Sequence, residues 1–133
     1  MTLYQPEEAV RFAVENGRPG EPIVIADTQD NPGAGGDSNT AGMLSALVKN
    51  RAEKAALGLM IDPTAAEIAH RAGVGAEVNL TFGGHSGFDG DEPFEALYTV
   101  AALHDGRFDA TGPFYKGAEF NLGPSACVKI GGT

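Results

Sequence analysis

The apolar and polar positions along the chain change their spacing near its middle. In the first half, continuously apolar runs alternate with residues at helical spacing, whereas in the second half apolar and polar residues alternate with a period of two. The patterns predict helices at residues 6–16, 38–49 and 62–73, and strands at 23–26, 55–61, 76–82, 94–103, 107–111 and 126–130. We therefore expect an α/β fold: a βαβ-type N-terminal half followed by a β-rich half, in a single sheet-centred domain spanning residues 1–133.

Capping and turn residues refine these boundaries. Asp37 or Ser38 is expected to cap the second helix, and Asp62-Pro63 is typical of the start of the third. The tripeptide His104-Asp-Gly106 is a hairpin signal, which predicts that the strands on either side of it pair with each other.

Composition narrows the range of functions. The chain has 133 residues, and its 18 acidic against 9 basic side chains give a net charge of −9. This charge repels phosphate groups, so we expect neither nucleic acid nor an anionic membrane as a partner. The N-terminus is acidic where a signal peptide would be basic, which predicts a cytoplasmic protein. The single Cys127 excludes an internal disulfide and a cysteine-based zinc knuckle.

Glycine is the unusual component, with 19 residues, and it is concentrated in loops. The loop from Asp27 to Asp37 follows a predicted buried strand and precedes a predicted helix, which is where open α/β sheets bind ligands. Gly33, Gly35 and Gly36 allow its backbone to approach a ligand closely. The loop matches no Walker A, dinucleotide or EF-hand pattern, and its three carboxylates disfavour a phosphate. A simple Asn-Pro-Gly turn followed by a helix cap is the structural alternative.

Candidate metal ligands are few and scattered. His70 lies in a predicted helix and His104 in a predicted turn, whereas His85 lies in the glycine-rich segment at residues 82–87. No paired histidine spacing typical of a metal site occurs. Convergence of Asp27, Asp30, Asp37 and His85 in space is an alternative that spacing alone leaves open.

One glycine-rich loop and six later blocks occur together in a specific order. They are Pro22-Ile-Val-Ile-Ala-Asp-Thr-Gln-Asp-Asn-Pro-Gly-Ala-Gly-Gly-Asp37, Asp62-Pro63, Ala72-Gly-Val-Gly75, Phe82-Gly-Gly84, Asp105-Gly-Arg-Phe108, Gly112-Pro-Phe-Tyr-Lys-Gly117 and Leu122-Gly-Pro-Ser-Ala126. In this order they resemble the C-terminal domain of the microcystinase C (MlrC) family of zinc metallopeptidases. The resemblance covers about residues 4–132, nearly the whole chain.

The resemblance implies a two-domain hydrolase whose larger N-terminal domain holds the zinc ligands and whose best-known member cleaves linearised microcystin, a peptide. That catalytic domain is expected to be missing here, so no catalytic or metal-binding residue is carried over. The loop motif alone transfers as a substrate-binding element facing the cleft. Its residues are Asp30, Asn31, Gly33, Gly35, Gly36 and Asp37, joined by His85, which stands where a basic residue often follows Gly-Gly in the family.

Three interpretations follow. The first is a non-catalytic C-terminal domain whose partners are the missing N-terminal catalytic domain, with its zinc, and a peptide-like substrate. The second is a stand-alone anion- or peptide-binding module that uses the loop at residues 27–37. The third is a small metalloenzyme that uses Asp30, Asp37 and His85. A missing segment that leaves a sheet edge or an apolar face uncovered also makes a homodimer an open alternative.

Overall fold

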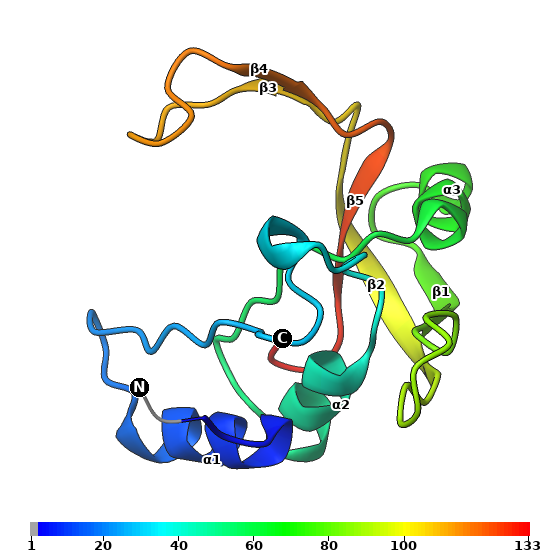
Figure 1. Ribbon diagram of the computed structural model, residues 1–133. Coiled ribbons are helices and arrows are strands. Elements are labelled where there is room, and N and C mark those ends of the chain that lie inside the picture. The colour runs from blue at the N-terminus through cyan, green and yellow to red at the C-terminus, as the bar shows by residue number, and fades with distance from the viewer. Residues whose placement is uncertain (1–2) are drawn as a thin grey trace. The chain divides into compact units, whose positions relative to one another are not determined.

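The computed structural model describes residues 3–133 and divides into two compact units, each described here by itself (Figure 1). The first unit contains the described residues up to Asp62 together with Thr81–Ala96 and Ile130–Thr133, and the second contains Pro63–Leu80 and Leu97–Lys129. Among the described residues, no helix combines the length and the apolar character that crossing a bilayer requires.

The first unit contains helix α1 (Pro6–Asn16), a short 3₁₀ turn (Pro32–Ala34) and helix α2 (Gly42–Lys49). The start of α1 is fixed by the Glu8 carboxylate, which accepts a hydrogen bond from the Gln5 N–H at 3.2 Å, a capping interaction expected where acidic residues follow Pro6. Helices α1 and α2 pack together, and their apolar sides form a core of Val10, Ala46, Leu47 and Ala52.

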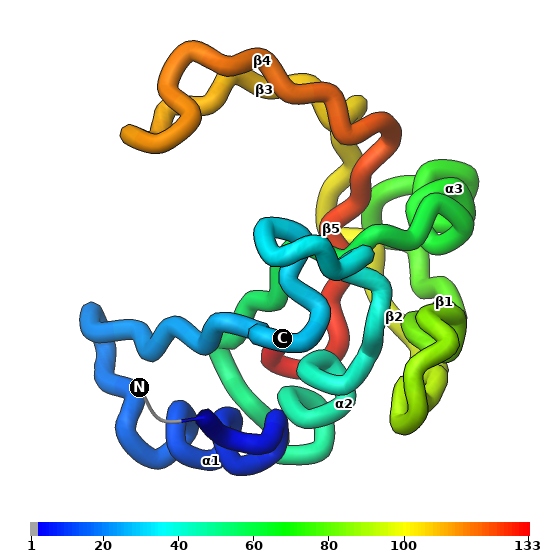
Figure 2. Tube along the Cα trace, viewed as in Figure 1, coloured from blue at the N-terminus to red at the C-terminus, as the bar shows by residue number. Residues whose placement is uncertain are grey.

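The strands predicted at 23–26 and 55–61 are wrong, because neither segment forms a strand. The first segment is part of an irregular stretch between α1 and α2 that Figure 2 follows as a continuous tube. Within it Ile25 packs against the core, whereas Val24 is 87% exposed. A β-branched run favours extended backbone but does not supply a neighbouring strand, so the first half lacks the predicted βαβ unit.

Helix α2 begins four residues later than predicted. Neither Asp37 nor Ser38 caps it, since Ala41 precedes its first residue and Ser38 has a φ of 56°. The main chain of Ser38 is instead tied to a distant segment, because the Ile61 N–H donates to the Ser38 carbonyl at 2.8 Å. Tertiary contacts therefore override the local capping signal.

The second unit contains helix α3 (Pro63–Ala72) and strand β5 (Ser125–Lys129), which pack against each other. Strands β1 (Glu77–Phe82) and β2 (Phe94–His104), shared between the units, complete a three-stranded sheet of order β1-β2-β5. Strand β2 pairs antiparallel with β5, with a register shift between Val100 and Ala102. Burial alternates strictly along β1, as the period of two predicted. The mixed α/β class is confirmed.

A separate two-stranded sheet is formed by β3 (Arg107–Asp109) and β4 (Glu119–Asn121). Within the second unit this hairpin extends away from the β2–β5 end that carries it (Figure 1). The strands pair antiparallel, with Phe108 opposite Phe120. The hairpin signal at residues 104–106 was therefore interpreted wrongly, because β3 pairs with β4 rather than with β2. Strand β4 was not predicted at all.

Candidate functional site

The carboxylate of Asp30 organises the glycine-rich loop of the first unit. Its Oδ1 accepts a hydrogen bond from the Ser38 N–H at 2.7 Å. Its Oδ2 accepts two hydrogen bonds from Thr40, one from the N–H at 2.8 Å and one from the hydroxyl at 3.0 Å. One side chain thus fixes both ends of the segment between residues 30 and 40.

The tip of this loop is a tight turn that requires glycine. The Asn31 side chain accepts a hydrogen bond from the Gly33 N–H at 2.8 Å, and the Asn31 carbonyl accepts one from the Gly36 N–H at 2.9 Å. Gly35 has a φ of +94°, in the left-handed region that glycine tolerates best. A Cβ on Gly36 would lie 2.8 Å from the Asn31 nitrogen. The glycines were predicted to let the backbone approach a ligand closely, and the structure shows that Gly35 and Gly36 already serve a tight turn within the loop itself.

A second carboxylate, that of Asp91, organises the loop that carries His85. Its Oδ2 accepts hydrogen bonds from the N–H groups of Gly84 at 2.9 Å and Ser86 at 3.1 Å, and from the Ser86 hydroxyl at 2.7 Å. His85 stands between these two anchored residues, and its side chain is exposed.

The two loops meet at Ala41, the residue before α2. A Cβ on Gly83 would lie 2.7 Å from the Ala41 Cβ and 2.9 Å from the Ala41 nitrogen, so only glycine fits there. The Asp30-bound segment ends at Thr40, directly before this contact. The first unit therefore joins the loop at 30–40 to the loop at 83–91 through backbone packing.

Both carboxylates are stabilised in their charged form. Partial desolvation raises the pKa of Asp30, but the hydrogen bonds from Thr40, Ser38 and Asn39 outweigh it and leave that pKa below its usual value. Desolvation likewise raises the pKa of Asp91, and the hydrogen bonds from Ser86, Gly84 and Ala41 lower it by more. The negative charges are thus used to hold backbone N–H groups.

The donor set of these loops does not fit a zinc ion. Across residues 3–133, no three histidine, cysteine, aspartate or glutamate side chains are grouped so as to hold a metal. Both oxygens of Asp30 already accept hydrogen bonds, and Asp37 and His85 are exposed. Zinc sites in proteins need three or four converging ligands. The proposed convergence of Asp30, Asp37 and His85 is therefore not a metal centre.

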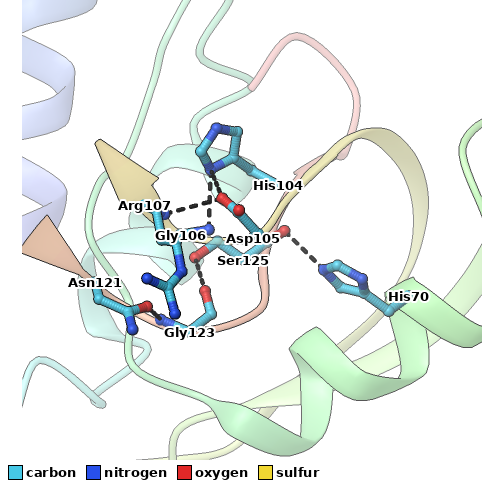
Figure 3. A network of polar contacts seen from close by, with 8 residues as sticks. All are labelled: His70, His104, Asp105, Gly106, Arg107, Asn121, Gly123 and Ser125. Carbon is cyan, nitrogen blue, oxygen red and sulfur yellow. Dashed lines mark hydrogen bonds and ion pairs between the residues drawn. The ribbon is translucent and has the colours of Figure 1, made fainter. Parts of the chain in front are cut away.

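The other two histidines lie where the β3–β4 hairpin leaves the sheet (Figure 3). From α3, the Nε2 of His70 lies 3.0 Å from the Ser125 carbonyl oxygen. On the strand side, the His104 Nδ1 accepts a hydrogen bond from the Gly106 N–H at 2.9 Å and lies 3.3 Å from the Asp105 carboxylate. These contacts tie the base of the hairpin, and they give the two histidines a structural role.

Sequence reasoning missed the residues that hold the loops in place. Thr40 and Asp91 were not singled out, although they take part in most of the hydrogen bonds described above. Each acts across five to ten residues of irregular backbone, a separation that fits neither helical nor strand periodicity. An aspartate downstream of a Gly-Gly-x-Ser segment is the one local signal that was available.

One family model and two known proteins are similar to this chain over most of its length. A family model described as the MlrC C-terminus matches residues 25–133. Microcystinase C of Sphingomonas sp. is 25% identical over 111 residues, which are 84% of this chain and 21% of that protein. A crystal structure from Mesorhizobium sp. BNC1, of a protein provisionally assigned as a metallopeptidase, matches with a TM-score of 0.81 and 22% identity. That match covers 99% of this chain and 26% of the other.

The chain therefore spans only about a quarter of the length of the relatives it matches. The high TM-score shows that this chain shares its fold with the matched part of the Mesorhizobium protein. Because the sequence identity is low, the similarity is evidence for the fold alone.

Proposed function

Because the chain belongs to the family described as the MlrC C-terminus, we propose that it is the non-catalytic C-terminal domain of an MlrC-like zinc metallopeptidase. The zinc ligands and the hydrolytic groups belong to the remaining, N-terminal part of such a protein. Most of each relative's length lies outside the matched segment, which leaves room for a separate catalytic part.

The proposed contribution of this domain is a fixed surface beside the substrate. The loop at residues 30–37 presents an exposed turn of glycines to the catalytic cleft, and a peptide-like substrate is held there through backbone N–H and C=O groups. Asp30 acts indirectly, by fixing the loop, whereas Asn31, Gly33, Gly35, Gly36, Asp37 and His85 face the substrate.

One observation carries this proposal: a glycine turn that is exposed yet firmly anchored. Gly33 and Gly35 are exposed, while three hydrogen bonds to Asp30 hold the ends of the same loop. A binding surface needs both properties, because a loop that is already ordered loses less entropy when a ligand binds.

The test takes the proposed catalytic part from a relative. The part of Microcystinase C outside its 111-residue match is produced as a separate polypeptide and mixed with this chain. We expect zinc, measured by atomic absorption, to stay with that polypeptide, and hydrolysis of linearised microcystin to require both components. Turnover by this chain alone would contradict the proposal, as would the absence of any gain on mixing.

A substitution at the exposed tip of the loop tests its role. Ala34→Glu adds a bulky charge to the turn and is expected to lower hydrolysis by the mixture about tenfold or more, an effect of the size seen when a bound ligand loses one good contact. Ala56→Glu, at another exposed alanine of the first unit, is the matched control and should leave the rate unchanged. Equal rates for both variants would show that the loop does not face the cleft.

A further inference from the structure

The β3–β4 hairpin exposes aromatic side chains without any core of its own. None of residues 107–122 is buried, yet this stretch contains four of the ten phenylalanines and tyrosines of the chain. Phe114 is 86% exposed, Tyr115 57% and Phe108 47%, and Leu122 adds a further apolar side chain at 48%. Exposed apolar side chains gathered in this way mark a surface that another molecule covers.

The rings are ordered by contacts with one another. Phe108 stacks on Phe120 across the strands with their centroids 5.4 Å apart, and Tyr115 meets the edge of Phe120 at the same distance. Phe114 packs edge-on against Tyr115 at 4.7 Å. A prearranged ladder of rings is a favourable interface, because little side-chain entropy remains to be lost on binding.

The base of the hairpin is fixed by close backbone packing. A Cβ on Gly106 would lie 2.0 Å from the Gly123 carbonyl oxygen, so the two segments of the chain cross at a point where no side chain fits. The Leu122 N–H donates to the Gly106 carbonyl at 2.9 Å, and the polar contacts of Figure 3 surround this crossing. A two-stranded hairpin is marginally stable alone, and here the close backbone packing at its base helps to hold the two strands together.

The hairpin is electrically neutral in a strongly acidic protein. Arg107 and Lys116 balance Asp109 and Glu119, so the net charge of −9 lies elsewhere on the chain. Protein interfaces are enriched in aromatic residues and depleted in uncompensated charge at their centres. Two copies of the chain would bring two charges of −9 together, which opposes a symmetric dimer. A different polypeptide is therefore the better occupant.

We infer that the aromatic face of the β3–β4 hairpin, formed by Phe108, Phe114, Tyr115 and Leu122, docks on an apolar groove in the remaining part of an MlrC-like protein. This inference rests on the proposed function. The matched segment is 21% of Microcystinase C and 26% of the Mesorhizobium protein, so a polypeptide several times larger than this chain accompanies it in both relatives.

Binding is measured by calorimetry between the 133-residue chain and the part of Microcystinase C outside its match. Phe114→Ser is expected to raise the dissociation constant about tenfold or more, because exposed aromatic anchors dominate interface energies. Tyr115→Ser is a second variant with the same expectation. Val74→Ser is the matched control, since Val74 is a 65% exposed apolar residue of the same unit, outside the hairpin. Circular dichroism checks that each variant is folded.

The outcomes separate this inference from the proposed function. Tight binding that Phe114→Ser weakens and Val74→Ser does not would support both. Binding that is equal for all variants would overturn the hairpin inference and leave the proposed function standing. No binding by the natural chain would overturn both. A dimer in sedimentation analysis that Phe114→Ser dissociates would identify a second copy as the occupant and overturn the inference.

Discussion

The anchored loops of the first unit and the hairpin of the second hold irregular or exposed backbone in place by opposite means. In the loops, Asp30 and Asp91 each accept three hydrogen bonds from nearby backbone and hydroxyl groups. In the hairpin, a regular ladder and stacked rings act together, and its one buried position is Gly106 at the root. Charge orders the first region, and packing orders the second.

This difference shows where each region tolerates change. A loop whose order depends on one carboxylate is sensitive to a single polar substitution and to acid. A hairpin whose side chains are exposed tolerates most substitutions along its length, because surface changes usually alter stability by about 0.5 kcal/mol or less. Its weak point is the backbone crossing at its base.

The largest effect is expected at the hairpin root. Gly106→Ala places a Cβ 2.0 Å from the Gly123 carbonyl oxygen, at a φ of +78°, so the strands must separate. We expect a loss of about 3 kcal/mol or more in the free energy of unfolding, measured by urea denaturation. Gly112→Ala is the control, since nothing lies within 4 Å of a Cβ there. Similar stability of the two variants would show that the root is not a packing constraint.

A smaller effect is expected in the loops. Asp30→Asn removes the charge and turns an amide nitrogen toward N–H donors, which should cost about 1–3 kcal/mol in the free energy of unfolding. The pKa of Asp30 is lower in the folded chain than its usual 3.8, so its contribution is complete above that value and disappears as the pH falls through the folded pKa. Below about pH 4, the free energy of unfolding should therefore fall less steeply in the variant than in the natural chain. Asp37→Asn, at an exposed carboxylate, should behave like the natural chain.

A third effect is expected at alkaline pH and arises in the second unit. Burial raises the pKa of Tyr98 from 10.0 to about 12, so its contribution is complete below pH 10 and is lost as the pH rises toward 12. Tyr98→Phe should therefore flatten the decline in the free energy of unfolding over that range while leaving the acid limb unchanged. An unchanged alkaline limb in this variant would show that Tyr98 does not carry the effect.

Much of the second half was predictable because its strands bury one face. Strand β1 alternates exposed and buried residues without exception, and this is the signal that a period-two pattern detects. The run at residues 23–26 has equally good strand residues, but no neighbouring strand pairs with it. Pairing partners are a property of the whole fold. The three-residue strand β4 is too short to show any period.

The candidate loop was found from its glycines, and its anchors were not. Gly35 and Gly36 indicate a tight turn in the sequence itself. The left-handed backbone at Gly35 and the close approach of Gly36 to the Asn31 backbone both favour glycine. Asp30 was singled out as a candidate metal ligand and, through the family resemblance, as a substrate-binding residue. Its hydrogen bonds to Ser38 and Thr40 depend on a left-handed Ser38 that no local rule predicts.

The exposed turn at the far end of the hairpin has a practical and an evolutionary consequence. A Cβ on Gly112 or on Gly117 would have no atom within 4 Å apart from its chain neighbours, so the turn is not packed against the rest of the chain at these two positions. Insertions in pairs would lengthen the ribbon while keeping its strand pairing, and lineages can adjust its reach without redesigning the scaffold beneath it. Because the same turn carries Phe114 and Tyr115, a fluorophore attached there would report on the docking of the aromatic face.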